Sequence, residues 1–92
     1  MAQEFKSVWD ALEETPAQAE NMKLRSSLMM AISEYVKKSK LTQKEVAKRM
    51  GTTQPRLNDV VKGRIEKCTV DRLVNMLATV GYKVEVSILK VA

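Results

Sequence analysis

The chain of 92 residues contains no histidine, one cysteine and few aromatic side chains. Without histidine there is neither an imidazole general base nor a histidine–cysteine metal cluster, and Cys68 has no intramolecular disulfide partner. A glycine-rich phosphate loop and a pair of carboxylates placed for acid–base catalysis are also missing. We therefore expect no enzymatic activity, no metal and no cofactor. Cys68 is expected to be a small, partly buried thiol in a reducing cytoplasm.

Long apolar runs are absent as well. No stretch approaches the roughly 20 residues that a membrane-spanning helix needs. The first ten residues, MAQEFKSVWD, lack the apolar segment of a signal peptide. The length allows one small domain with a modest core. We expect a single cytoplasmic domain without membrane contact.

The net charge of +5 is distributed unevenly. Residues 1–20 contain five acidic side chains against Lys6 alone, so their net charge is −4 and the remainder carries +9. Most of the basic residues fall between positions 37 and 67. Such an excess is typical of proteins with a polyanionic partner, although a run of charge is also the ordinary solvated face of a helix.

Apolar spacing and capping residues predict five helices. In the first 14 residues, apolar side chains repeat at i, i+3, i+4 and i+7, as on one face of a short helix. These are Phe5, Val8, Trp9 and Leu12. Thr15 and Pro16 mark the start of a long helix that ends near Lys38. Its apolar stripe consists of Met22, Leu24, Leu28, Ile32, Tyr35 and Val36.

Two short helices follow the long one. In the motif TQKE, Thr42 and Glu45 form a capping box that opens the third helix. Gly51 supplies the left-handed residue that ends it. Thr53 caps the fourth helix, and Pro55 in its first turn sacrifices no intrahelical hydrogen bond. This helix is expected to end at the next glycine, residue 63.

Inward positions of the two short helices are apolar, and Ala47 is small where the helices approach each other. The inward residues are Val46, Met50, Leu57, Val60 and Val61. This is the helix-turn-helix arrangement, in which the second helix enters the major groove of DNA and its first residues reach base edges. The pattern therefore predicts a double-stranded DNA partner.

A fifth helix over residues 70–80, capped by Thr69 and ended by Gly81, precedes a tail in which apolar and polar residues alternate as in a strand. A lone strand leaves its edges unpaired. We therefore predict that the tail pairs, antiparallel, with the same strand of a second copy. The expected dimerisation residues are Tyr82, Val84, Val86 and Ile88.

The segment QKEVAKRMGTTQPRLNDVVKG resembles the helix-turn-helix of the phage repressor and Cro (XRE) family. The matching residues are Gln43, Val46, Ala47, Met50, Gly51, Thr52, Thr53, Gln54, Leu57 and Gly63. The resemblance implies an all-α, five-helix, lambda-repressor-like domain with a C-terminal β-strand pairing in a dimer. We divide the chain into an acidic amphipathic segment (1–14), a helix-turn-helix domain (15–81, motif 42–63) and a dimerisation strand (82–92).

A wider resemblance begins at VWDAL and continues through the motif to VEVSI. In this respect the chain is similar to the compact XRE-type antitoxins, the HigA-like proteins of bacterial toxin–antitoxin pairs. In that family the DNA-binding protein represses its own operon and neutralises a ribonuclease toxin of the RelE/HigB type. Toxin binding is implied only by this resemblance, whereas the residue pattern itself predicts only the DNA-binding half.

The resemblance also assigns base-reading roles. Gln54 follows the turn, and its amide suits adenine N6 and N7, although it is otherwise an ordinary solvent-facing glutamine. Pro55 replaces the commoner polar residue, so one expected base contact is missing. Arg56 lies at the positive end of the helix dipole, which slightly lowers the stability of the helix. A contact with guanine or phosphate would offset this cost. Asp59 either accepts from a cytosine amine or pairs with Lys62 or Arg56. The predicted base-reading residues are Gln54, Arg56, Asn58 and Asp59.

Contacts to the DNA backbone are expected around the base-reading helix. Gln43 opens the preceding helix, where the family contacts phosphate and braces the reading glutamine. Lys62 and Arg64 flank Gly63 and would add affinity without sequence information. The predicted phosphate-binding residues are Gln43, Lys44, Thr52, Thr53, Lys62 and Arg64.

Three functions are compatible with the sequence. The first is a dimeric antitoxin that represses its own palindromic operator and binds a ribonuclease toxin. The second is a stand-alone XRE transcription factor without a toxin, and the third is a helical adaptor that binds only proteins. For the first, the acidic N-terminal segment is expected to contact the toxin through Phe5, Trp9 and Leu12, unless these residues only cover the long helix.

Overall fold

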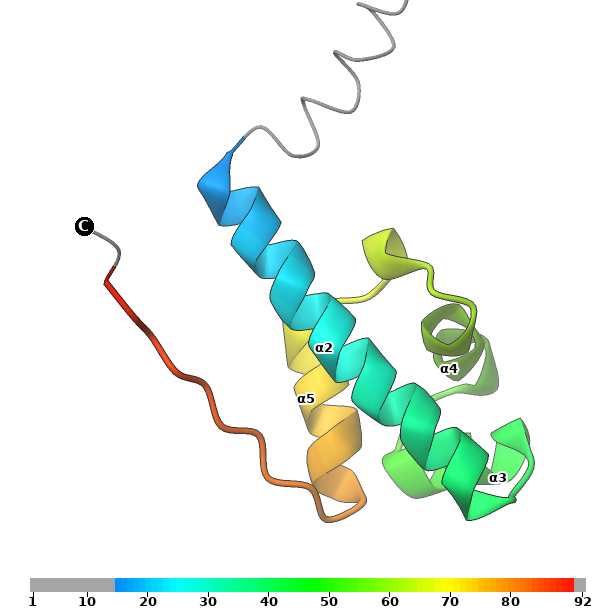
Figure 1. The fold of residues 1–92 in the computed structure, drawn as a ribbon. Helices are drawn as coiled ribbons and strands as arrows, with labels where there is room; N and C mark the ends of the chain where they lie inside the picture. The colour runs from blue at the N-terminus through cyan, green and yellow to red at the C-terminus, as the bar shows by residue number, and fades with distance from the viewer. Residues whose placement is uncertain (1–14, 91–92) are drawn as a thin grey trace, which may run out of the picture.

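The computed structural model describes residues 15–90, and the regular structure within them is helical (Figure 1). Its elements in chain order are α2 (Pro16–Ser39), α3 (Gln43–Met50), α4 (Gln54–Val61), the 3₁₀ turn η1 (Ile65–Lys67) and α5 (Val70–Thr79). Four of the five predicted helices are therefore present. The remaining one, with Phe5, Trp9 and Leu12, lies outside the described residues.

The long helix α2 begins where its cap predicts. The Thr15 hydroxyl accepts a hydrogen bond from the Gln18 amide at 3.1 Å, and Pro16 occupies the first helical position. At the other end, Lys40 adopts a left-handed φ of 58° and turns the chain into α3. A lysine in this conformation is uncommon, and the sequence pattern did not predict it.

The caps of α3 and the turn that follows agree with the prediction. Thr42 and Glu45 form the capping box, with both reciprocal hydrogen bonds at 3.1 Å. The hydrogen bonds from Thr42 lower the pKa of the Glu45 carboxyl. Gly51 has a φ of 71°, and the Thr52 amide donates to the Ala47 carbonyl at 2.9 Å. This is a Schellman ending, which turns the chain sharply toward α4.

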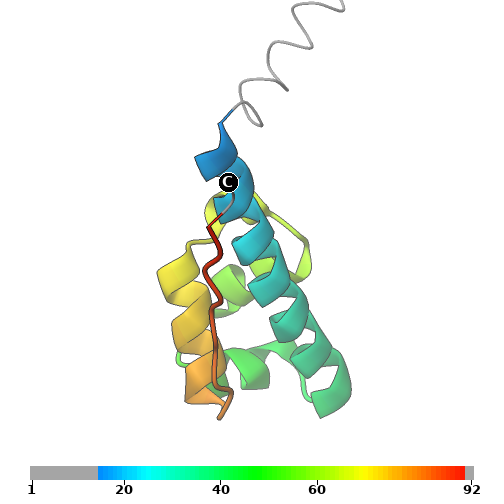
Figure 2. The same cartoon turned by 60° about the vertical axis from the view of Figure 1, so that its left-hand side comes forward.

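One hydrophobic core holds the four helices together. Val46, Leu57 and Ile32 are completely buried, and α2 packs along α5, its neighbour in both views (Figures 1 and 2). Among residues 15–90, the buried side chains are Leu28, Met29, Ile32, Val46, Ala47, Met50, Leu57, Val60, Cys68, Leu73, Met76 and Leu77. The predicted inward residues are confirmed, except that Val61 is only partly buried. Met29, absent from the predicted stripe, is also buried.

The predicted C-terminal strand is not formed within the described part of the chain. Residues 82–90 leave α5 and run back toward the N-terminal end of α2 (Figures 1 and 2). The root of this tail is anchored to the domain by two contacts. The Tyr82 and Tyr35 rings pack edge-on with 6.1 Å between their centroids, and Val84 packs against the core. Val86 and Ile88 are 60% and 90% exposed. A strand needs a backbone partner, and residues 15–90 of one copy offer none, so strand pairing stays a prediction.

None of the helices in residues 15–90 is both long and apolar enough to cross a bilayer.

The left-handed turn yields a stability prediction. In Gly51→Ala, an added Cβ meets no heavy atom within 4 Å, so the cost is conformational and lowers the free energy of unfolding by about 1–2 kcal/mol. Gly51→Asn should lose less, because asparagine tolerates this conformation. Urea unfolding at one fixed protein concentration measures both variants. Equal losses in the two variants would show that backbone strain is not the cause.

Candidate nucleic-acid interface

The first turn of α4 faces solvent because the rest of the helix faces the core. Leu57 and Val60 are 0% and 3% exposed, which leaves Gln54 and Arg56 on the outer side. The Thr53 hydroxyl accepts a hydrogen bond from the Arg56 amide at 3.3 Å and fixes the start of the helix. The arrangement thus holds two polar side chains at the outward end of a rigid helix, with Asn58 half-buried behind them.

The turn and the start of α3 supply the neighbouring polar groups. Lys44 and Thr53 are exposed, and Gln43 is half-buried at the first position of α3. Thr52 is placed differently. Its hydroxyl oxygen is buried without a hydrogen-bond partner in the described chain, and its amide is bonded to the Ala47 carbonyl. The structure therefore brings Gln43, Lys44 and Thr53 to this surface, but turns the polar groups of Thr52 inward.

Asp59 and Arg64 form an ion pair across the end of α4. The Arg64 Nη1 donates to the Asp59 Oδ1 at 3.1 Å, and the two side chains are 47% and 21% exposed. The pair forms because Gly63, at a φ of 76°, folds the chain back so that the Arg64 amide also reaches the Asp59 carbonyl at 2.9 Å. An ion pair was one of the two predictions for Asp59, but the partner is Arg64 rather than Lys62 or Arg56.

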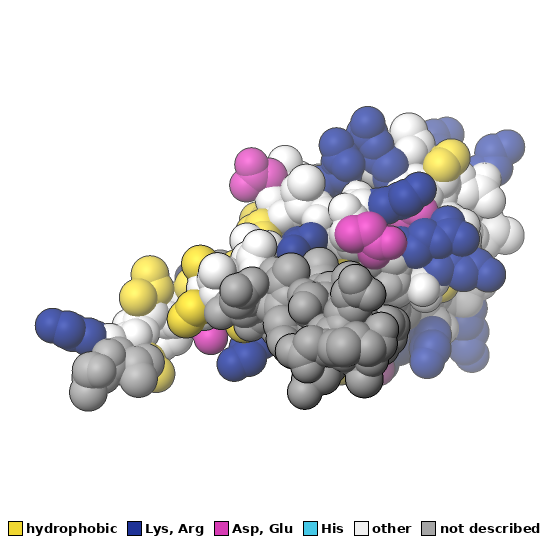
Figure 3. Space-filling model, turned by 90° about the horizontal axis from the view of Figure 1, so that it is seen from above, with side chains coloured by type: hydrophobic (Ala, Val, Ile, Leu, Met, Phe, Trp, Pro, Cys, Tyr) yellow, Lys and Arg dark blue, Asp and Glu magenta, His cyan; other side chains and the backbone are white. Residues whose placement is uncertain are grey.

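Basic side chains gather over the side of the molecule that carries α3, α4 and η1 (Figure 3). The exposed ones on these elements and their connecting turns are Lys44, Lys48, Arg49, Arg56, Lys62, Arg64 and Lys67. Within residues 15–90, only Arg64 among them pairs with a carboxylate. Cations without acidic partners attract a polyanion.

The turn between α4 and α5 is held by a residue that the sequence pattern did not single out. The Arg25 Nη1, from α2, donates to the carbonyls of Ile65 at 2.8 Å and Cys68 at 3.3 Å. The Cys68 thiol donates to the Arg64 carbonyl at 3.4 Å. Cys68 is only 5% exposed, and burial raises the pKa of its thiol. Arg25 therefore positions η1, and with it Arg64 and Lys67, from the long helix behind them.

No cluster of metal-binding side chains was found near this surface. Within the described residues, no three of histidine, cysteine, aspartate and glutamate lie close enough together to hold a metal ion.

Comparison with known proteins agrees with this geometry. A search of curated proteins gave no match. Residues 11–89 match the model of a family described as a helix-turn-helix domain. The match includes every helix from α2 to α5 and most of the tail, and so covers more than half of the chain. The chain therefore belongs to the helix-turn-helix domain family, a family of DNA-binding domains.

Proposed function

We propose that this protein is a sequence-specific regulator of transcription, of the phage repressor and Cro (XRE) type, that binds double-stranded DNA as a dimer. The observation that carries the proposal is the first turn of α4. It projects Gln54 and Arg56 outward from a helix whose other side is locked into the core by Leu57. A short helix of this kind lies beside a second helix and among cations of which, within residues 15–90, only Arg64 pairs with a carboxylate. Such a helix fits the major groove.

Each polar group then has a role set by its position. Gln54 hydrogen-bonds an adenine edge, and Arg56 reaches guanine or the adjoining phosphate. Asn58, half-buried behind them, takes a peripheral base contact. Gln43, Lys44, Thr53 and Lys62 bind phosphate and fix the register of the helix.

The ion pair changes the weight of two of the proposed contacts. The Asp59 carboxylate already accepts from Arg64, so a cytosine contact would require this pair to open. Arg64 keeps a phosphate contact while it is paired, because a guanidinium has five donors. We therefore retain Arg64 as a phosphate-binding residue and give Asp59 less weight as a base-reading residue.

For the assembly, we propose that the tails of two copies pair antiparallel about a two-fold axis. Support comes from the exposed apolar side chains of Val86 and Ile88 on a segment whose root is anchored to the domain. Such a dimer would present two α4 helices to half-sites about 34 Å apart and would select a palindromic operator.

We further propose that the protein is a HigA-like antitoxin that represses its own operon and neutralises a RelE/HigB-like ribonuclease. The acidic N-terminal residues support this role, since a ribonuclease is basic around its RNA channel and attracts an acidic amphipathic segment. Phe5, Trp9 and Leu12 would be the apolar anchors. A stand-alone transcription factor is the alternative, and a neighbouring gene for a small basic protein would favour the antitoxin.

The DNA proposal predicts two different responses to substitution. With an operator selected from random duplexes, Gln54→Ala should weaken binding by about 1–3 kcal/mol and relax the preference at one base pair of each half-site. Lys62→Ala should weaken all duplexes alike and reduce the salt slope. Fluorescence anisotropy over a salt series measures both effects.

The matched control is Gln18→Ala, which alters an exposed glutamine in the first turn of α2. It should leave binding unchanged. Intact affinity and specificity in Gln54→Ala would refute the assignment of Gln54, and salt-independent binding would favour a protein-binding adaptor.

The assembly proposal predicts a monomer after removal of residues 83–92, because Tyr82 still anchors the end of the domain but no strand remains. Light scattering should show half the mass, and cooperative operator binding should be lost. Ser87→Lys, on the opposite side of the predicted strand from Val86 and Ile88, should stay dimeric. A truncated chain that remains dimeric would place the interface elsewhere.

The antitoxin proposal predicts that a chain beginning at Thr15 keeps at least the operator affinity of the full chain but no longer neutralises the toxin. Calorimetry with the product of the adjacent gene would measure the loss, and Trp9→Ala in the full chain should reproduce much of it, since a large aromatic anchor dominates such contacts. Undiminished toxin affinity of the shortened chain would remove residues 1–14 from the toxin interface.

A further inference from the structure

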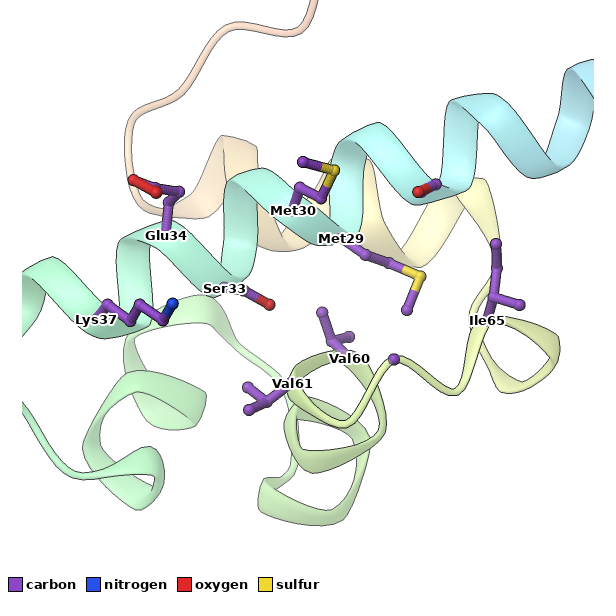
Figure 4. Close-up of a pocket in the computed structure, with 10 residues that line it drawn as sticks. Met29, Met30, Ser33, Glu34, Lys37, Val60, Val61 and Ile65 are labelled. Atoms are coloured by element: carbon purple, nitrogen blue, oxygen red, sulfur yellow. The ribbon is translucent and has the colours of Figure 1, made fainter.

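An open apolar groove runs along α2 on the side of α4 and η1. One hollow of this groove, of about 430 Å³, lies between Met29 and Met30 of α2 and Val60, Val61 and Ile65 across from them. Met29 and Val60 point toward one another in this hollow (Figure 4). A second hollow, lined by Met22, Lys23, Ser26, Ser27 and Ile65, shares Ser26 and Ile65 with the first. Together they extend from Met22 to Lys37, about 22 Å at 1.5 Å per helical residue.

The rim of this groove is unusually apolar for a solvent-facing surface. Met30 is 67% exposed, the largest value for a large apolar side chain outside the tail among the described residues. Met22, Val61 and Ile65 are only partly buried. Contiguous exposed apolar side chains mark interaction sites, and methionine adapts its shape to an incoming apolar side chain. The groove thus fits one face of an amphipathic helix.

We propose that the occupant is the N-terminal segment of this same chain, with Phe5, Val8, Trp9 and Leu12 seated in the groove. These four residues form the one apolar helical face that the sequence predicts before Thr15. The segment joins α2 only six residues before Met22, where the groove begins. A reversal over residues 13–15 lays an eight-residue helix, about 12 Å long, against α2 between Met22 and Met30.

Charge favours the same occupant. Residues 1–14 carry Glu4, Asp10, Glu13 and Glu14 against Lys6, whereas Lys23 and Lys37 stand at the two ends of the groove on α2. Glu34 also lines the groove, but its carboxylate pairs with Lys38. Lys23 already pairs with Glu20, but both side chains are about three-quarters exposed, so that pair is weak and exchangeable. The tail is a poorer occupant, since it lies along the α5 side of the molecule (Figure 1).

Docking has a consequence for the proposed toxin contact. The same apolar side chains cannot contact the groove and a toxin at the same time. Docking of the segment in the groove and binding of the segment to the toxin therefore exclude each other. The docking proposal itself needs neither toxin nor DNA, and its test uses neither.

Trp9 is the only tryptophan, so its fluorescence reports the segment directly in the full-length protein. The wild-type emission should be blue-shifted and weakly quenched by acrylamide. Met30→Glu, which places a carboxylate on the groove rim, should shift both values to those of the urea-unfolded chain. Met30→Leu should keep the wild-type spectrum. Ala78→Glu, an equal change of charge at an exposed position of α5, should also keep it. Circular dichroism verifies that each variant is folded.

A second measurement separates docking within one chain from docking between copies. Chains carrying Met30→Glu are mixed with an excess of chains carrying Trp9→Phe, whose groove is intact but which do not fluoresce as tryptophan. Emission that stays red-shifted supports docking within the chain. Recovery of the blue shift would overturn that assignment in favour of a second copy. A wild-type spectrum equal to that of the unfolded chain, or one unchanged by Met30→Glu, would refute the groove as the docking site.

Discussion

The turn at Gly51 is the constraint on which the DNA-facing side of this protein depends. Its left-handed backbone lets the Thr52 amide bond the Ala47 carbonyl, so α3 closes and α4 starts within three residues. Val46 and Leu57 are then fully buried, which fixes the two helices against the core. Because Leu57 faces inward, Gln54 and Arg56 face outward. The outward orientation of the candidate reading residues is therefore a consequence of how α3 ends.

The long helix α2 serves as the support for this motif. It contributes Leu28, Met29 and Ile32 to the core, and its Arg25 holds the backbone of the α4–α5 turn by two hydrogen bonds to carbonyls. Hydrogen bonds from a charged donor are stronger than neutral ones, so they add to the packing of Cys68 and Ile65 against the core in fixing this turn. The same turn carries Arg64 and Lys67. The partly buried Arg25 side chain of α2 thus helps to position the turn that carries these two cations.

Interactions that are local in sequence were predictable, and those made by chain reversal were not. Thr42, Thr53 and Thr69 cap their helices as expected, because a cap depends on residues three positions apart. The Asp59–Arg64 pair was not predicted, because helical spacing favoured Lys62 or Arg56 as the partner of Asp59. The reversal of the chain at Gly63 brings Arg64 next to Asp59 instead. Arg25 contacts carbonyls some 40 residues away, for which no periodicity exists. The strand is not formed within residues 82–90 of the structure and stays a prediction, because alternation gives a strand only where a partner backbone is present.

The groove and the proposed DNA surface share a boundary, and this links the charge asymmetry of the chain to its function. Gly63 and Ile65 line the groove, while Lys62 and Arg64, on either side of Gly63, are the proposed phosphate-binding residues. An acidic segment docked in the groove lies beside these cations and competes with phosphate for them. Thermodynamic linkage makes the competition reciprocal, so docking weakens operator binding by the same factor by which the operator weakens docking. A ligand that removes the segment from the groove, as the proposed toxin contact requires, then strengthens operator binding. Under the docking proposal, the −3 charge of residues 1–14 would tune the affinity of the DNA-binding domain without touching DNA.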